Sequence, residues 1–334
     1  MANLGRDVTL AVDPATGGVT AEAVLRFYGL DPLPTLHLHV LPRSRTAGSI
    51  AYRALFSAWV AQGGGIALAR SKKHAREAHA RLGRYFTLVV EAHEVDSLQL
   101  AASGRDGGPM RQLESEVLKA ASAVVCNAPG TLALLRDVHP VLPPALVAHN
   151  GTRCTPFPAP HVDAHGVGYV GSVRAYKDLE TLARAAPQIS ESVHLVGAEP
   201  TDPFAHALAK MAEGALILEP PLAYRHVPER MSRFRVLVVP AAKGLFGEQL
   251  TSPLKLWDAL ASGVVVVAAD TPAMRAAAGA AFIPYQPADA GDLVAAVEMA
   301  LGNEQRRESA LEAATVRTWA DRARELLAFV ESVR

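Results

Sequence analysis

Hydrophobic residues fall into two alternating patterns along this chain of 334 residues. Short runs rich in β-branched residues and apolar at almost every position are typical of strands buried on both faces of a parallel sheet. They cover 7–12, 35–41, 64–70, 86–93, 123–128 and 145–150 in the first half, and 167–172, 192–197, 215–220, 235–241, 264–270 and 280–285 in the second. Segments such as 112–121 and 176–189 lie between them, with apolar residues at helical spacing. Strands that alternate with helices in this way predict an α/β protein with doubly wound parallel sheets.

A segment without periodicity divides the chain near its middle. Residues 149–166 are rich in Pro, Gly and His, a composition typical of linkers between domains. The length also suits two domains of about 150 residues each. We therefore predict a Rossmann-like domain over 1–152, a linker over 153–166, a second such domain over 167–312, and a terminal helix over 313–334 that packs back toward the first domain.

Composition narrows the class of protein further. Half of the residues are apolar, which is enough for two cores, and the 33 basic residues balance the 33 acidic ones. No overall field therefore draws the chain to nucleic acid or to a membrane. The two cysteines, Cys126 and Cys154, are too few for a disulfide framework. The first residues lack the pattern of a signal peptide, and no apolar run approaches about 20 residues, so we expect a cytoplasmic protein with reduced thiols.

Several blocks of sequence occur in an order and at a spacing typical of a known family. The blocks of the second half are 167–186, 192–200, 235–241 and 251–277, and the weaker ones of the first half are 86–95, 113–135 and 147–153. In these blocks the chain resembles the retaining glycosyltransferases of family 4, most sharply over 252–272. The resemblance implies the GT-B fold, in which two Rossmann-like domains face a cleft. It also implies transfer of a hexose-type sugar from a UDP- or GDP-type nucleotide sugar to an acceptor, with retention of configuration.

The turn after the strand at 167–170 is the first candidate for binding the nucleotide sugar. Ligands of open α/β sheets bind beyond the carboxyl ends of the strands, and at Gly171 and Ser172 backbone N–H groups could approach a phosphate. Lys177, in the helix that follows, would oppose the diphosphate; a solvated surface lysine is the alternative. Relatives place an arginine where this chain has Ser172, so Arg174 is the candidate substitute. The resemblance adds Gly197, after the next strand, to the donor-binding set.

A second candidate lies at the start of the helix that follows residue 253. Ser252, Pro253 and Leu254 precede this helix, so their amides and the helix dipole could hold negative charge. Relatives carry two acidic residues eight positions apart here, and the resemblance implies that the second, Asp258, binds the ribose hydroxyls. An exposed helix carboxylate is the alternative for Asp258.

The first of those two acidic positions is Leu250 in this chain, and a leucine cannot bind a hydroxyl. Glu248 lies two residues earlier and could approach the sugar hydroxyls from the loop at 244–250. A loop carboxylate with no role at the site is an equal alternative for Glu248. We assign it to the catalytic set on that basis.

The end of the strand at 86–90 carries the candidates of the first domain. Glu91, His93 and Glu94 follow this strand, and the resemblance implies that His93 contacts the transferred sugar close to the reacting carbon. A histidine that merely caps a loop is the alternative. His37 and His39 share one face of a strand but have no third ligand in sequence, so we predict no metal site.

The leaving diphosphate needs positive charge as the bond to the sugar breaks. No D-x-D triplet, the metal-binding motif of the other large transferase fold, occurs in the sequence. Lys177 and the amides near Gly171 and Ser252 would then stabilise the diphosphate without a metal or other cofactor. The catalytic candidates are His93, Lys177 and Glu248.

A basic segment bears on the acceptor, which the sequence leaves open among a glycan, a lipid-linked molecule and a small molecule. Between residues 70 and 84, Glu77 is the only acidic residue, and the basic ones are Arg70, Lys72, Lys73, Arg76, Arg81 and Arg84. Such clusters dock peripheral enzymes on anionic membranes, here the inner face of the cell membrane. A solvated helix face is the alternative.

The chain departs from its relatives at the start. Relatives open with a strand, a Gly-rich loop and a helix before a strand like 7–12, whereas this chain begins at the end of that helix. The missing strand would lie in the middle of the sheet and leave apolar surface and backbone groups uncovered. A start assigned too far downstream and a genuinely reduced sheet are the two explanations. A nucleotide-sugar epimerase and a non-catalytic nucleotide-sugar-binding protein stay open as alternative functions.

Overall fold

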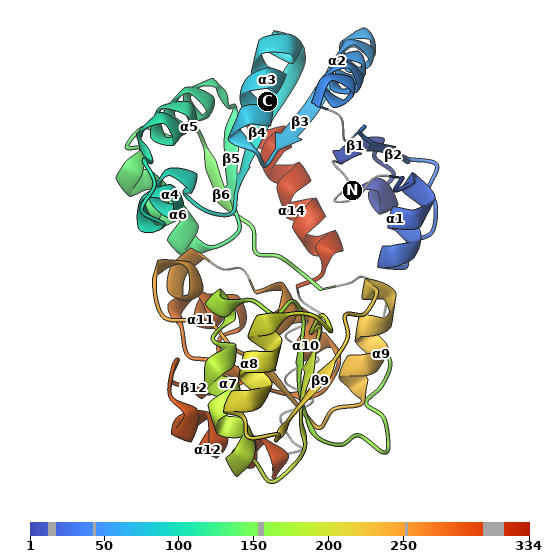
Figure 1. Cartoon of the computed structure of the whole chain (residues 1–334). Coiled ribbons are helices and arrows are strands. Elements are labelled where there is room, and N and C mark those ends of the chain that lie inside the picture. Colours follow the sequence, from blue (N-terminus) through green and yellow to red (C-terminus); the bar gives the residue numbers. More distant parts are fainter. Residues whose placement is uncertain (13–17, 43–44, 153–156, 251–252, 303–316) are drawn as a thin grey trace. The chain divides into compact units, whose positions relative to one another are not determined.

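The computed structural model describes residues 1–12, 18–42, 45–152, 157–250, 253–302 and 317–334 (Figure 1). Each of the predicted strand segments contains a strand. The strands are β1 (Val8–Val12), β2 (Leu36–Val40), β3 (Gly65–Ala69), β4 (Phe86–Ala92), β5 (Ala123–Cys126), β6 (Ala145–Val147), β7 (Val167–Val170), β8 (Val193–Val196), β9 (Leu216–Glu219), β10 (Val236–Val239), β11 (Val265–Ala269) and β12 (Ile283–Tyr285).

Helices lie between most of these strands, and the described residues between β6 and β7 contain none. They are α1 (Ala21–Tyr28), α2 (Arg45–Ala61), α3 (Lys72–Leu82), α4 (Asp96–Ala102), α5 (Gly108–Ala120), α6 (Pro129–Val138), α7 (Leu179–Ala185), α8 (Pro203–Met211), α9 (Val227–Ser232), α10 (Leu254–Ala261), α11 (Pro272–Ala278), α12 (Ala290–Leu301) and α14 (Trp319–Ser332). Among the described helices, none is both long enough and apolar enough to cross a bilayer.

Helix starts follow from local sequence. Asp202 accepts a hydrogen bond from the N–H of Phe204, and Thr271 accepts one from the N–H of Met274. A proline follows each of these capping residues at the first helical position, where its missing N–H costs nothing. Capping residues therefore fix where α8 and α11 begin.

The chain divides into two compact units. Unit 1 comprises Met1–Asn127, Thr131–Ala148 and Ala323–Arg334, and unit 2 comprises Ala128–Gly130 and His149–Arg322. The main part of unit 1 thus ends at Ala148, whereas the sequence predicted residue 152. Thr152 belongs to unit 2 because its N–H donates to the carbonyl of Arg317, and its carbonyl accepts from the N–H of Trp319.

Unit 2 is a doubly wound sheet of six parallel strands in the order β12-β11-β10-β7-β8-β9. The chain moves outward from β7 to β9, then returns to the other side of β7 with β10. In such sheets this reversal point, at the carboxyl ends of the two central strands, is where ligands bind. Trp257, Tyr169 and Phe234 are among its largest fully buried side chains.

Unit 1 contains two separate parallel sheets, one of β1 and β2 and one in the order β3-β4-β5-β6. Helix α14 comes from the far end of the chain, yet its Leu326 and Val330 are fully buried in one cluster with Val89 and Val125. The C-terminal helix therefore crosses back to unit 1, and the predicted part of it before residue 317 lies outside the described residues. Figure 1 shows α14 in red beside β4 to β6.

Unit 1 contains one described cysteine, Cys126. Cys126 on β5 is a buried free cysteine, and burial raises the pKa of its thiol to about 12. Such a thiol is a poor nucleophile because almost none of it is ionised at neutral pH. Cys154 lies outside the described residues.

Candidate functional site

Gly171 directly follows β7, at the reversal point of the unit 2 sheet. Its φ of 150° belongs to a region that side chains disfavour, and a Cβ there would collide with Nζ of Lys255. Its N–H donates to the carbonyl of Val196 at 2.8 Å, so the Gly171 amide is not free for a phosphate as the sequence suggested. The glycine instead makes room for a lysine ammonium.

Lys255, on α10, was not among the predicted site residues. Its Nζ donates to the hydroxyl of Tyr169 and lies 4.1 Å from the centroid of that ring. The Tyr169 hydroxyl in turn donates to the carbonyl of Ser172 at 2.7 Å, and burial raises its pKa. A cation thus lies over an aromatic face at the turn after β7, an arrangement that favours the charged form only modestly.

Lys177 is the second cation at this turn. It ends a 3-10 turn, Ala175–Lys177, just before α7, rather than lying in the first turns of that helix as predicted. Burial lowers the pKa of Lys177. Burial and then the charge of Lys177 lower the pKa of Lys255 well below its ordinary value.

Neither ammonium has a counter-ion in the part of the chain that the structure describes. Among the described residues, no carboxylate lies within ion-pair distance of Lys177 or Lys255. Lys177 is half-buried and lies close enough to Lys255 for their like charges to interact, and its role toward a diphosphate stays a prediction. Two neighbouring ammonium groups with no carboxylate partner among the described residues can bind an anion.

A cavity of about 240 Å³ lies at the ends of β7 and β8. The predicted residues that line it are Gly171, Ser172, Arg174 and Gly197, and Pro221 and Leu222 line its other side. A Cβ on Gly197, whose φ is 118°, would collide with the carbonyl oxygen of Gly171. The structure therefore brings these four predicted residues together, and two glycines allow their backbones to touch.

Asp258 lies on α10, one turn beyond Lys255. It is 6% exposed, so the alternative of an exposed carboxylate is wrong. One of its oxygens accepts from Thr152 Oγ1 at 3.0 Å, and the other accepts from the Tyr224 hydroxyl at 2.9 Å. The binding of ribose hydroxyls by Asp258 stays a prediction.

The predicted amide cradle before α10 is smaller than the sequence suggested. Pro253 is the N-cap residue and has no N–H, so it cannot donate to a phosphate. Leu254 is exposed at the first helical position. Ser252 lies outside the described residues. The start of α10 therefore contributes the ammonium of Lys255 to the candidate phosphate site, and not a set of three backbone amides.

Glu248 lies on a π-helical turn, Phe246–Leu250, and not on an open loop as predicted. Its N–H donates to the carbonyl of Gly244 at 2.9 Å. A Cβ on Gly247 would collide with the carbonyl of Ala242, so a glycine lets the turn pack closely there. Leu250 is buried at 1% exposure, which suits the apolar residue at this position. The catalytic role of Glu248 stays a prediction.

The predicted residues of unit 1 lie at the carboxyl end of β4: Glu91 is on the strand, and His93 and Glu94 follow it. His93 Nε2 lies 3.2 Å from Glu91 Oε1, within ion-pair distance but without making a hydrogen bond. Burial and the charge of Asp96 raise the pKa of Glu94. Within the described ranges, no three His, Cys, Asp or Glu side chains come together as a metal site requires.

The basic segment is less uniform than its sequence suggests. Lys72 is buried, and its Nζ lies 3.1 Å from Asp96 Oδ2, a counter-ion from the next strand–helix connection. Lys72 therefore does not face solvent or a membrane. Arg70, Lys73, Arg76 and Arg81 are exposed, and the side chain of Arg84 lies outside the described residues.

A comparison with protein families matches one part of the chain. Residues 164–303, which span the turn after β7, Lys177, Lys255 and Asp258, match the family model described as Glycosyl transferases group 1. A comparison of the sequence with curated proteins finds no match.

Solved structures match the chain over nearly its whole length. Sucrose-phosphate synthase from Thermosynechococcus elongatus has a TM-score of 0.78 at 18% identity, covering 99% of this chain and 90% of that one. A glycosyltransferase from Rickettsia africae ESF-5 has a TM-score of 0.72 at 12% identity, with coverages of 99% and 91%. HepE from Anabaena, solved with UDP and glucose, has a TM-score of 0.69 at 13% identity, with coverages of 93% and 89%. The chain therefore has the GT-B fold, and its residues 164–303 match the group 1 glycosyltransferases.

Proposed function

We propose that the protein is a glycosyltransferase that moves a hexose-type sugar from a nucleotide diphosphate to an acceptor hydroxyl, with retention and without a metal. The observation that carries this proposal is the pair of half-buried lysines, Lys177 and Lys255, beside the turn after β7. A diphosphate is the anion that suits two adjacent cations at the reversal point of such a sheet. The family match over 164–303 and the GT-B fold support the same class of reaction.

The reaction breaks the bond between the sugar's anomeric carbon and the phosphate oxygen, and forms a bond from that carbon to the acceptor oxygen. The acceptor's proton passes to the leaving diphosphate, so charges and atoms balance. Retention follows if both events occur on one face of the sugar. Lys177 and Lys255 would stabilise the charge that grows on the diphosphate.

The nucleoside would occupy the cavity that Arg174, Gly197 and Pro221 line. Its volume of about 240 Å³ suits a nucleoside better than a whole nucleotide sugar. HepE was solved with UDP and glucose, and we extend a UDP- or GDP-type nucleotide sugar to this chain on that basis. The roles of His93 and Glu248 toward the sugar stay predictions.

The acceptor is a glycan, a lipid-linked molecule or a small molecule. Exposed Arg70, Lys73 and Arg76 leave a cationic surface for an anionic acceptor or an anionic membrane. Binding to vesicles of anionic lipid, lost on neutralising Lys73 and Arg76, would support the membrane contact. Lys72 is left out of that test because it is buried.

A panel of nucleotide sugars tests the proposal directly. A nucleotide sugar at about 100 times its Kd should stabilise the protein by about 2.7 kcal/mol, visible as a raised Tm. Nucleotide release that requires an acceptor extract supports a transferase. Turnover of the nucleotide sugar without an acceptor would make the protein an epimerase, and binding without release would make it a binding protein. No stabilisation by any UDP or GDP sugar contradicts the proposal.

The lowered pKa of Lys255 predicts a pH dependence of nucleotide binding. A bound diphosphate favours the ammonium, so binding raises that pKa and takes up protons. The affinity for UDP should therefore fall as pH rises through the lowered pKa, in a window below the ordinary value of 10.5. In the free protein the unfolded chain holds this proton more tightly, so the free energy of unfolding should rise with pH across the same window.

Calorimetry of UDP binding in buffers of different ionisation enthalpy measures the proton uptake. The uptake should shrink in the Lys255→Met variant, because its side chain does not titrate. Equal uptake in the variant and the original protein would show that another group is responsible.

A further inference from the structure

Three polar side chains contact one another in a row on the unit 2 sheet. Ser192 directly precedes β8, His194 lies on β8, and Glu219 lies on the neighbouring strand β9. The Ser192 Oγ lies 3.0 Å from His194 Nε2, and His194 Nδ1 lies 2.7 Å from Glu219 Oε1. We call these three residues the Ser192 cluster. None of them lines the cavity at the ends of β7 and β8 that we assign to the nucleoside.

Arg230 on α9 keeps the Glu219 carboxyl group in its charged form. The Arg230 Nε donates to Glu219 Oε2 at 2.9 Å, and a second guanidinium nitrogen donates to Oε1. The hydrogen bonds from Arg230, partly offset by burial, lower the pKa of Glu219, and contact with His194 lowers it further. Glu219 is therefore a carboxylate at neutral pH, and a carboxylate can only accept hydrogen bonds.

The Glu219 carboxylate fixes which nitrogen of the neutral His194 ring carries the hydrogen. Because Glu219 Oε1 can only accept, the Nδ1 beside it is the donor, and Nε2 is left as the acceptor. Arg230 Nη2 also approaches Nδ1, but at 3.4 Å it lies farther away than Glu219 Oε1. The Ser192 hydroxyl therefore donates to Nε2. This is the direction in which a histidine base takes the proton of a serine nucleophile.

The surrounding residues hold the histidine in place and leave the serine accessible. The His194 side chain is 12% exposed, and its ring centroid lies 5.4 Å from that of buried Phe234. A Cβ on Gly166 would lie 2.8 Å from Ser192 Oγ, so a glycine gives the hydroxyl its room. Ser192 itself is exposed. A serine hydroxyl is activated as a nucleophile by such a fixed, oriented base.

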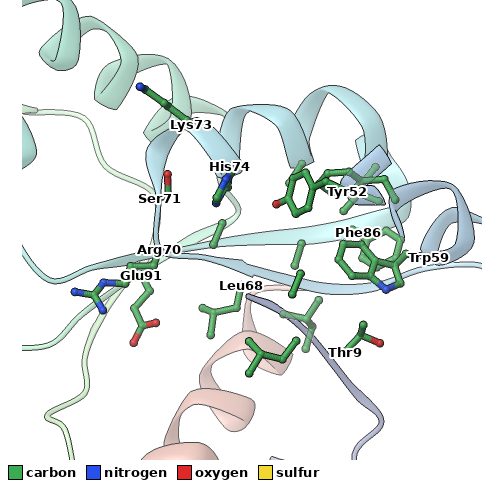
Figure 2. A pocket seen from close by; sticks show the side chains of 18 of the residues that line it. Thr9, Tyr52, Trp59, Leu68, Arg70, Ser71, Lys73, His74, Phe86 and Glu91 are labelled. Carbon is green, nitrogen blue, oxygen red and sulfur yellow. The ribbon is translucent and has the colours of Figure 1, made fainter. Parts of the chain in front are cut away.

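Two other exposed serines lack this arrangement. Figure 2 shows Ser71 and His74 on the wall of a hollow of about 920 Å³ in unit 1. In the described part of the chain no hydrogen bond joins these two side chains, and no carboxylate lies within ion-pair distance of His74. Ser190 is exposed two residues before Ser192, but its hydroxyl donates to Glu298 Oε2 at 2.8 Å. Of these three serines, only Ser192 donates to a nitrogen base.

We propose that Ser192 is a nucleophile that takes up a short acyl group from an ester, at a site separate from the nucleotide site. The Ser192 Oγ forms a bond to the ester's carbonyl carbon, and its proton passes to His194 Nε2. The bond from that carbon to the leaving oxygen then breaks, and His194 returns the proton to that oxygen. Glu219 is a positioning residue that stabilises the imidazolium between these two steps. Ser192 is exposed and lines neither cavity described above, which favours a short acyl group over a long chain.

Reaction of the full chain with p-nitrophenyl acetate tests the proposal. Absorbance follows the release of p-nitrophenolate, and peptide mass spectrometry locates the acetyl group. We expect a burst of about one p-nitrophenolate per chain, with the acetyl group on Ser192. Ser192 should be acetylated at least 100-fold faster than Ser190, which is the scale of general-base catalysis. Equal rates at the two serines, or no acetylation of Ser192, overturns the proposal.

A matched pair of serine variants shows which hydroxyl reacts. Ser192→Ala should abolish the burst, whereas Ser190→Ala, at the same surface turn, should leave it unchanged. A burst that persists in Ser192→Ala contradicts the proposal.

Substitutions of the other two residues test how the serine is activated. His194→Ala should slow acetylation of Ser192 at least 100-fold, and added imidazole should restore at least a tenfold part of this loss. Glu219→Gln should slow it at least tenfold, because a neutral amide neither fixes the proton on Nδ1 nor stabilises the imidazolium. Acetylation of Ser192 in His194→Ala at the original rate, or a loss that imidazole does not restore, would overturn the role of His194 as the base.

Discussion

Lys255→Met should lower turnover by a factor on the order of 10² to 10³, the scale for losing one preorganised group that stabilises a leaving charge. Methionine keeps the length and apolar stem of the side chain but removes the ammonium that lies over Tyr169 beside Gly171. The affinity for UDP should fall by about tenfold or more, because a charge-assisted contact contributes about 1.5 to 3 kcal/mol. The variant should be at least as stable as the original protein, since burial disfavours the Lys255 charge in the free state.

Lys177→Ala should have an effect of the same order on turnover. The two lysines would bind one diphosphate, so their effects should not add, and a double-mutant cycle measures the coupling. Lys210→Met is the matched control, because Lys210 is an exposed lysine of α8 in the same unit. Unchanged UDP affinity in Lys255→Met would remove Lys255 from the site, and unchanged turnover in Lys177→Ala would do the same for Lys177.

Glu114→Ala should destabilise unit 1 by about 3 kcal/mol. The Glu114 side chain on α5 is fully buried and accepts from Ser97 N–H at 3.3 Å and from Ser97 Oγ at 2.6 Å. Its Oε2 also lies 3.1 Å from Nε2 of buried His139. Alanine would leave these buried groups without an acceptor, and each such loss costs about 1 to 3 kcal/mol.

Urea unfolding followed by hydrogen exchange in β4 and α5 measures this effect within unit 1. Glu116→Ala, on the exposed side of the same helix, should change the free energy of unfolding by no more than about 0.5 kcal/mol. Glu114→Gln should fall between them, because its amide keeps one acceptor. A change in Glu114→Ala as small as that in Glu116→Ala would show that the network contributes little to stability.

The fold was predictable because each strand and helix start is indicated by the few residues that form it. Continuously apolar runs fixed the strands, and cap residues such as Asp202 and Thr271 fixed helix starts. The crossing of α14 follows from a helical pattern after the last strand. The division of unit 1 into two sheets was not predicted: no described strand pairs with both β1 and β3.

The site was predictable only in part, because its key contacts join distant residues. Lys255 looked like an ordinary residue at the start of a helix, and its role depends on the approach of Gly171 and Tyr169 from β7. Lys72 was counted in the basic cluster between residues 70 and 84, because its partner Asp96 follows a different strand. The local signal for Lys255 was a single lysine in the mostly apolar segment 254–260.

The origin of α14 has a consequence for the order in which the protein forms during synthesis. One face of the unit 1 sheet, with Val89 and Val125, is covered by Leu326 and Val330, which the ribosome adds only after the whole of unit 2. At ordinary elongation rates that interval is on the order of 10 to 40 s. During this interval one apolar face of the unit 1 sheet is uncovered and open to binding by chaperones. Unit 2, although synthesised later, can already fold.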